Sequence, residues 1–259
     1  MGSATRGALA TARGVLDAEK ATLATGEQLL AAARALASST QLRSVIADPG
    51  ITAGDKASLI TQVFPGSDKT AATVLASVSG LRWSNPNQLV DSVEELGIRA
   101  LAATAAGLED ELFEIDRAVS SDAELEFALG GTFGDPRAKA QLVERLLAKK
   151  ASPATIAIVA HLVQSPRERR IGELLAFAAR TVADASGGLV ATVTAAAPLT
   201  PAQQKKLVAQ LTAKHGREPR LDVRIDPAVI GGLKVQVGDE IVDGTIATRL
   251  ADLRLQLAG

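Results

Sequence analysis

The chain has 259 residues, of which 47% are hydrophobic, enough for one large domain or two to three small ones with real cores. Its 28 Lys and Arg against 29 Asp and Glu, together with five Phe, one Trp and no Tyr, argue against a nucleic-acid binder, which needs a basic surface and stacking aromatics. The absence of Cys excludes disulfides, thiolate metal sites and Cys nucleophiles.

The start of the chain contains Arg6 and Arg13 and no acid before Asp17, a weak likeness to a transit peptide. Leu9, Ala12 and Leu16 fall at helical spacing, which favours an ordinary first helix. The most apolar stretches, 70–81 and 151–166, are shorter than the ~20 apolar residues of a membrane-spanning helix. We therefore expect a soluble, cytoplasmic protein.

Residues 1 to about 186 are predicted to be almost entirely helical, because apolar residues such as Leu29, Ala33 and Leu36 recur at helical spacing. Pro- and Gly-containing breaks separate the helices, at 48–52, 64–68, 84–87, 130–136, 151–153 and 165–167. Helices this rich in Ala bury little area each, so they need one another. The pattern predicts a multi-helix bundle.

The pattern of apolar residues in this helical region repeats at a nearly constant offset in residue number. The same offset aligns Leu42 with Leu125 and Lys56 with Lys139, and an almost identical offset aligns Leu89 with Ile171 further along. Segments rich in Ala and Leu also match by coincidence, but the offset persists across four successive elements. We predict a duplicated helical bundle, with one copy at 1–105 and a second at 106–186.

The pattern changes at 185–188, and residues 187–259 are predicted to form a small α+β domain. Alternation predicts strands from 189 and at 220–226, and two further short strands joined at Gly238 and Asp239. Between them lies a helix with Thr200 as its N-cap, Pro201 at its first position and Gly216 after its end. The expected last helix carries Leu250, Leu253 and Leu257, with Ile246, on one stripe.

The glycine-rich stretch at 224–245 is the strongest candidate for chemistry. Gly231, Gly232 and Gly238 do not form a dinucleotide-binding G-x-G-x-x-G pattern, and a predicted strand, not a helix, follows them. Glycine in a strand pattern more often marks a bulge or a close backbone approach. The glycines are therefore interpreted as structural.

Other candidate residues lack the sequence context that catalysis or metal binding needs. Asp239, Glu240 and Asp243 have no carboxylate held nearby in a pocket, and turn acids are usually solvated. His161 and His215 are far apart along the chain, without metal-ligand spacing. We predict no catalytic residue, no cofactor and no metal.

Two charged segments have alternative interpretations. Residues 108–117 are acidic, which is typical of a solvated helix face, with an acidic docking surface as the alternative. Residues 165–170 are basic and are interpreted as a loop and helix start.

The last third of the chain resembles a known family. The stretches "VTAAAPLTPAQQKKLVAQL" and "LDVRIDPAVIGGLKVQVGDEIVDGTIATRLADLRLQL" are similar to the C-terminal half of the delta subunit of bacterial F-type ATP synthase, whose mitochondrial counterpart is the oligomycin-sensitivity-conferring protein. "ATRGALATA" and "LRSVIADPGITAGDKASLITQVF" resemble the family's N-terminal helices. The signature residues are Leu221, Ile225, Asp226, Ile230, Gly231, Gly232, Val237, Gly238, Asp243 and Gly244.

The resemblance implies a non-catalytic stator subunit that binds no nucleotide. In the family, an N-terminal helical bundle grips the amphipathic N-terminal helix of an alpha subunit, and the C-terminal part meets the end of the b subunit. Such a connector links the catalytic head to the peripheral stalk while rotation drives ATP synthesis. The implied location is the cytoplasmic side of the membrane, bound peripherally through the complex.

The family has a single helical domain, whereas this chain is predicted to have two. The resemblance therefore does not say which copy binds the alpha-subunit helix. Our hypothesis is that the first copy grips alpha and the second extends or braces the connection. By analogy with the family's first and fifth helices, the contact residues are Ala8, Leu9, Ala12, Leu75 and Ser79. Leu250, Leu253 and Leu257 either meet b or pack on their own sheet.

Two other classes of function are open. A helical-repeat adaptor of another assembly would have no affinity for an alpha N-terminal peptide. An enzyme using the hairpin acids would lose turnover on Asp239→Ala and Asp243→Ala.

Overall fold

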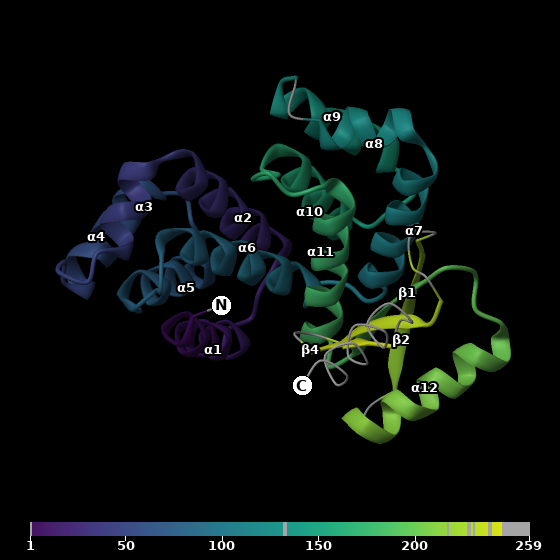
Figure 1. Cartoon of the computed structure of the whole chain (residues 1–259). Coiled ribbons are helices and arrows are strands. Elements are labelled where there is room, and N and C mark those ends of the chain that lie inside the picture. Colours follow the sequence, from purple (N-terminus) through teal and green to yellow (C-terminus); the bar gives the residue numbers. More distant parts are fainter. Residues whose placement is uncertain are drawn as a thin grey trace, which may run out of the picture. The chain divides into compact units, whose positions relative to one another are not determined.

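The structure is a computed structural model that describes residues 2–131, 134–216, 218–226, 229, 231–237 and 240–244. The chain divides into two compact units, residues 1–182 and residues 183–259. The first is helical, and the second combines strands with a helix (Figure 1). The predicted fold class, mostly α with a C-terminal α+β domain, is confirmed.

Short capped helices build the first unit. Polar residues before most helices accept a hydrogen bond from the first turn, as Ser39 does from the Leu42 N–H at 3.2 Å. The helices are α1 (Ser3–Asp17), α2 (Leu23–Ser38), α3 (Thr40–Ala47), α4 (Ala53–Val63), α5 (Lys69–Gly80), α6 (Pro86–Ala102), α7 (Leu108–Ser121), α8 (Ala123–Gly130), α9 (Pro136–Leu147), α10 (Pro153–Gln164) and α11 (Ile171–Ala185).

The helix bounds recur along this unit. The offset in residue number from the start of α3 to that of α8 equals the offset from α4 to α9, and α10 follows α5 at nearly the same offset. A similar offset relates the start of α2 to that of α7, and the start of α6 to that of α11. It also relates the start of α1 to that of α6. The bounds thus agree with a repeat in which α6 is both the last helix of one set and the first of the next. The division at residue 105 stays a prediction, and we refer to α1–α6 as the first copy and to α7–α11 as the second.

Two hydrophobic clusters fill the helical unit, and α6 belongs to both. Its Leu96 packs in the cluster of the first copy, while its Ile98 and Leu101 pack in the cluster built on α7–α11. The second cluster also takes Leu30 from α2. From 89 to 102 every residue of α6 except Asp91 is buried. A helix surrounded in this way must contribute to the stability of both copies.

Two glycines allow α2 and α6 to approach closely. A Cβ added at Gly97 would lie 2.7 Å from Leu30 Cδ2 and 3.1 Å from the Leu30 backbone nitrogen. A Cβ at Gly26 would lie 2.4 Å from Leu101 Cγ and 3.2 Å from the Gly97 carbonyl oxygen. The two helices therefore cross so closely that a side chain at either glycine would force its neighbours to shift.

The second unit has a mixed sheet in the order β2-β1-β3-β4. The strands are β1 (Leu189–Ala195), β2 (Pro219–Ile225), β3 (Leu233–Val237) and β4 (Glu240–Asp243), and α12 (Pro201–His215) links β1 to its parallel neighbour β2. The strand β3 pairs antiparallel with both β1 and β4. The predicted strands are confirmed, while the predicted last helix lies outside the described residues.

The residues predicted to begin and end α12 are confirmed as well. Thr200 forms a capping box with Gln203, Pro201 is the first residue, and Gly216 ends the helix at a φ of 72°. The helix contributes Leu211 to a small core with Ala191 and Val193 of β1.

Candidate interaction sites

The five predicted alpha-contact residues lie together in the interior of the first copy. Ala8, Leu9 and Ala12 of α1 and Leu75 and Ser79 of α5 are each 6% exposed or less. Small residues lie on the outer surface of the two helices, beside charged ones such as Arg6 and Lys69. Ala4, Gly7 and Thr11 are exposed on α1, and Ala72 and Ala76 are half-buried on α5.

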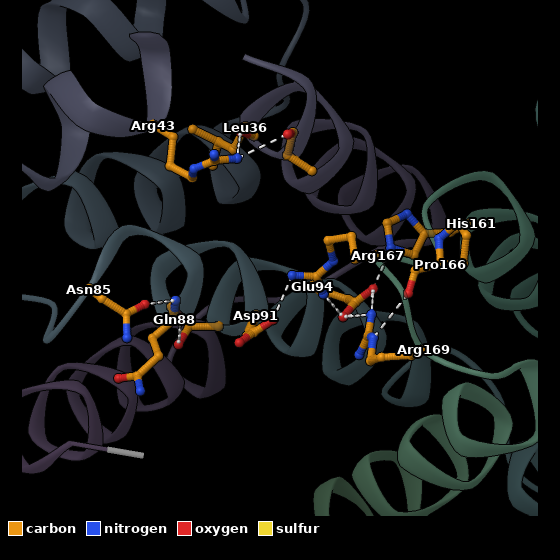
Figure 2. Close-up of polar contacts among 12 residues, drawn as sticks. Leu36, Arg43, Asn85, Gln88, Asp91, Glu94, His161, Pro166, Arg167 and Arg169 are labelled. Atoms are coloured by element: carbon orange, nitrogen blue, oxygen red, sulfur yellow. Dashed lines mark hydrogen bonds and ion pairs between the residues drawn. The ribbon is translucent and has the colours of Figure 1, made fainter. Parts of the chain in front are cut away.

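A buried carboxylate joins the two copies. Figure 2 shows Glu94 of α6 meeting side chains from α10 and from the loop after it. Its Oε1 lies 3.0 Å from His161 Nε2, and its two oxygens lie 3.0 and 2.8 Å from Arg169 Nη2. Arg167 pairs with Glu94 as well, and its Nη1 lies 2.5 Å from Asp91 Oδ1. We call these five residues the Glu94 cluster.

The cluster keeps Glu94 ionised inside the protein. Its side chain is only 1% exposed, and removal from water disfavours a charge. Burial raises the pKa of Glu94, but the His161 hydrogen bond and the charges of Arg167 and Arg169 together hold it below its usual value. Such a pair is retained only with good geometry, and losing one partner leaves an uncompensated charge.

His161 connects the cluster to α2 of the first copy. Its Nδ1 lies 2.9 Å from Arg34 Nη1, and because a guanidinium can only donate, Nδ1 accepts. The proton is therefore on Nε2, which donates to Glu94. Burial, together with the charges of Arg34 and Arg167, lowers the pKa of His161 more than Glu94 raises it, so the ring is neutral, in agreement with this tautomer. A neutral imidazole thus links two charged groups from different helices.

The loop at 165–170 is strained where it carries the cluster's cations. Arg167 and Glu168 have φ values of 48° and 65°, in the left-handed region that side chains disfavour. The loop itself was predicted, but its ion pairs were not. The available sequence signal was the acidic pair at Glu94, within a helix otherwise patterned for burial.

Part of the second copy's surface is covered by the first. Because the repeat offset relates α1 to α6 and α5 to α10, the contact of α6 with α10 corresponds to that of α1 with α5. The helix α2 packs against both α6 and α10, placing Leu30 in the second cluster and Arg34 against His161. The α1–α5 pair has no such helix from the second copy among its principal contacts in the described region.

In its described part, the glycine-rich stretch forms turns and backbone contacts at the ends of the sheet strands. Gly231 and Gly232 have φ values of 65° and 83° directly before β3, and the Gly244 N–H donates to the Leu233 carbonyl at 2.9 Å. A strand, not a helix, follows the glycine pair, so no helix N-terminus is offered to a phosphate there. These φ values and this hydrogen bond agree with the structural interpretation of the three glycines, which stays a prediction.

Only some of the other candidate residues of the C-terminal unit lie in the described part of the structure. The Asp226 N–H donates to the Ala195 carbonyl at 2.9 Å, and Asp243 ends β4. Exposed Glu240 pairs with Lys214, and its Oε2 lies 4.0 Å from His215 Nε2. Ile230, Gly238, Asp239, Leu250, Leu253 and Leu257 lie outside the described residues. Across the described part of the chain, no group of His, Cys, Asp and Glu is arranged to hold a metal ion.

Comparison with known proteins gives consistent matches along the whole chain. The "ATP synthase subunit delta" of Leifsonia xyli subsp. xyli is 46% identical over 264 residues, covering 100% of both chains. That of Streptomyces griseus subsp. griseus is 40% identical over 275 residues, again covering 100% of both. The family model for the ATP synthase delta (OSCP) subunit matches residues 99–257.

The chain belongs to the ATP synthase delta (OSCP) subunit family. The resemblance seen in the sequence is therefore confirmed. A chain in the cryo-EM structure of the Toxoplasma gondii mitochondrial ATP synthase hexamer is also similar, with a TM-score of 0.40 and 19% identity over 62% of this chain and 97% of that one. That structural likeness is too weak to support an inference.

The family match begins inside α6, which places most of the first copy before it. The two bacterial relatives nevertheless align with the whole chain, so they share this extra N-terminal part. The second copy and the C-terminal unit together thus correspond to the family's common core. Within the described region, no helix is long and apolar enough to cross a membrane.

Proposed function

We propose that this chain is the delta subunit of an F-type ATP synthase, a peripheral-stalk connector between the catalytic head and the b subunit. The observation that carries the proposal is its end-to-end similarity to subunits of that name, at 46% identity for one relative. The chain then holds the head against the torque of the rotor while ATP is made. It performs no turnover of its own, and its work is done by binding surfaces at the cytoplasmic side of the membrane.

The alpha subunit's N-terminal helix is assigned to the α1–α5 side of the first copy. The support is the packing of α2, which covers the corresponding α6–α10 contact of the second copy. Ala8, Leu9, Ala12, Leu75 and Ser79 are buried and hold the two helices together. The partner helix would lie on their small outward neighbours, because small residues let helices approach closely. The second copy then braces the first.

The b subunit is assigned to the C-terminal unit. Leu250, Leu253 and Leu257 provide an apolar stripe suited to a partner helix, although they lie outside the described residues. Packing of the same stripe on its own sheet is the competing interpretation.

The test is binding of the full-length chain to two synthetic peptides, the alpha N-terminal segment and the b C-terminal segment, by fluorescence anisotropy. Gly7→Trp should weaken alpha-peptide binding by at least about tenfold, because Gly7 is exposed and its Cβ direction is open. Gln62→Trp, on the exposed face of α4, is the matched control and should bind normally. Normal binding by Gly7→Trp would move the site elsewhere. No binding of either peptide would favour an adaptor of another assembly.

A further inference from the structure

A pocket lined by arginines lies where the two helical copies meet. It has a volume of about 570 Å³ and opens between α2, the start of α9 and the end of α10 with the loop that follows. Arg34 of α2, Arg137 of α9 and Arg167 of the loop line it, and Asp135 is the one acid among its described lining residues. The lining therefore carries an excess of positive charge.

No acid balances the charge of Arg34. In the described part of the chain its side chain has one polar contact, that of Nη1 with His161 Nδ1 at 2.9 Å, and this ring is neutral. Glu94 binds the opposite nitrogen of the ring, so the imidazole separates that carboxylate from the guanidinium. Burial lowers the pKa of Arg34, as expected of a charge withdrawn from water. A half-buried cation of this kind is stabilised by a counter-ion.

Arg34 is not needed at the end of its own helix. The last carbonyls of α2 are bound by Arg43, whose Nη1 donates to those of Leu36 and Ala37 at 3.2 and 3.0 Å. A guanidinium carries several N–H donors, and His161 uses one nitrogen of Arg34. Within the described region, the other donors of Arg34 are left for a ligand.

Two further donors line the same pocket. Arg137 is exposed and forms no ion pair within the described residues, and the half-buried Ser165 hydroxyl has no hydrogen-bond partner among them. The carboxylate of Asp135 is engaged as the N-cap of α9, accepting from the Arg137 backbone N–H at 3.0 Å. Arg167 is balanced by its ion pairs within the Glu94 cluster. The charge available to a ligand is therefore that of Arg34 and Arg137.

This set of groups matches the chemistry of phosphate. Guanidinium groups bind phosphate oxygens through paired N–H donors, and a phosphate with about two negative charges balances two of them. The pocket volume falls within the ~300–1,000 Å³ of small-ligand sites. None of the described lining residues is aromatic, so a nucleotide base would have no ring to stack on. A free phosphate therefore suits the pocket better than a nucleotide.

We propose that this pocket binds inorganic phosphate or pyrophosphate. A phosphate group accepts hydrogen bonds from the guanidinium groups of Arg34 and Arg137 and from the Ser165 hydroxyl. Because Arg34 belongs to α2 and Arg137 to α9, the bound anion joins the two helical copies beside the Glu94 cluster. The inference goes beyond the proposed function and does not depend on it.

His161 provides a direct readout of binding. The chain has two histidines, so the full-length chain labelled with ¹³C at histidine Cε1 should give two ring signals by NMR. His161 contacts Arg34, whereas His215 ends α12 in the C-terminal unit. Titration with phosphate, and separately with pyrophosphate, at constant pH and ionic strength should shift the His161 signal saturably and leave that of His215 unchanged. Acetate should bind at least about tenfold more weakly, and ATP no more tightly than pyrophosphate.

Substitutions locate the bound anion. Arg34→Gln should weaken phosphate binding at least about tenfold, and Arg137→Gln at least about fivefold, because each removes a charged hydrogen-bond donor. Arg137 is exposed, so its replacement leaves the core intact and tests the site even if Arg34→Gln disturbs the fold. Arg145→Gln removes the same charge at an exposed α9 position outside the pocket and should bind normally. Thermal melting checks that each variant is folded.

Several results would overturn the proposal. If His161 does not respond to either anion, or responds without saturation, Arg34 serves only to orient the ring. Equal affinity for acetate would remove the preference for phosphate, and tighter binding of ATP than of pyrophosphate would remove the free anion as the ligand. Equal binding by Arg137→Gln and Arg145→Gln would place the anion elsewhere. Failure to bind the alpha and b peptides would refute the proposed function alone, so the two failures are distinguishable.

Discussion

At the scale of single residues, Glu94 offers the sharpest test of what joins the helical copies. Glu94→Gln keeps the size of the side chain but removes the charge that Arg167 and Arg169 share. We expect a loss of about 3 kcal/mol in the free energy of unfolding, because breaking a buried ion pair leaves its partners uncompensated. Urea denaturation followed by circular dichroism measures it.

The matched control for Glu94 is Asp91→Asn, which removes a second carboxylate bound to Arg167. The Asp91 side chain is 44% exposed, so its ion pair is screened by water, and we expect a loss of less than about 1 kcal/mol. Equal losses for the two variants would show that burial of the cluster has no energetic importance.

His161 predicts a dependence of stability on pH. Burial lowers the pKa of His161 in the folded chain, while the unfolded residue titrates near 6.5. As pH falls through about 6.5, the unfolded chain gains a proton that the folded chain refuses, so the free energy of unfolding decreases by up to about 1.4 kcal/mol per pH unit. His161→Gln should remove this component between pH 8 and about 5.5. An unchanged slope in the variant would contradict the assignment.

Glu94 adds to the same trend at lower pH. Its folded pKa lies below its usual value, so the stability that it contributes is present above its unfolded pKa and is lost as pH falls through the folded one. The two groups therefore act in the same direction, in successive pH windows, and acid should weaken the contact between the copies.

At the scale of elements, the crossing of α2 over α6 depends on glycine. Gly97→Ala gains about 1 kcal/mol of helix propensity, but its methyl group would lie 2.7 Å from Leu30 Cδ2 and 3.1 Å from a backbone nitrogen. Overpacking of this kind costs about 1–3 kcal/mol, so we expect net destabilisation. Gly14→Ala in α1, with nothing within 4 Å of its Cβ, should instead stabilise by up to about 1 kcal/mol. Midpoints of urea unfolding that shift the same way would refute the close crossing.

The elements that local signals define were predictable, and the contacts between them were not. Thr200 and Pro201 mark the start of α12 and Gly216 marks its end, each next to the turn of helix that it caps. The pairing of Glu94 with Arg167 joins positions 73 residues apart, and no local pattern connects them. The analogy that selected Ala8 and Leu75 named the right helices to pack together but could not separate their buried faces from their exposed ones.

At the scale of the whole molecule, recurring core positions predicted a repeat, with which the helix bounds agree, whereas no sequence signal indicated that α6 is shared. A helix that serves two bundles is buried on all sides, which looks in sequence like an ordinary apolar helix with a few unexplained charges. Volume and neighbours, not residue class, decide such features.

The sharing of α6 predicts that the two helical copies unfold as one cooperative unit. Ile98 packs in the second cluster and Leu96 in the first, and both are 0% exposed. Truncating either to Ala should cost about 2–5 kcal/mol. Native-state hydrogen exchange should then accelerate in both α5 and α10 for each variant, because the opening reaction breaks both clusters. If Ile98→Ala accelerates exchange only in α10, and Leu96→Ala only in α5, the copies open independently and α6 is merely a boundary between them.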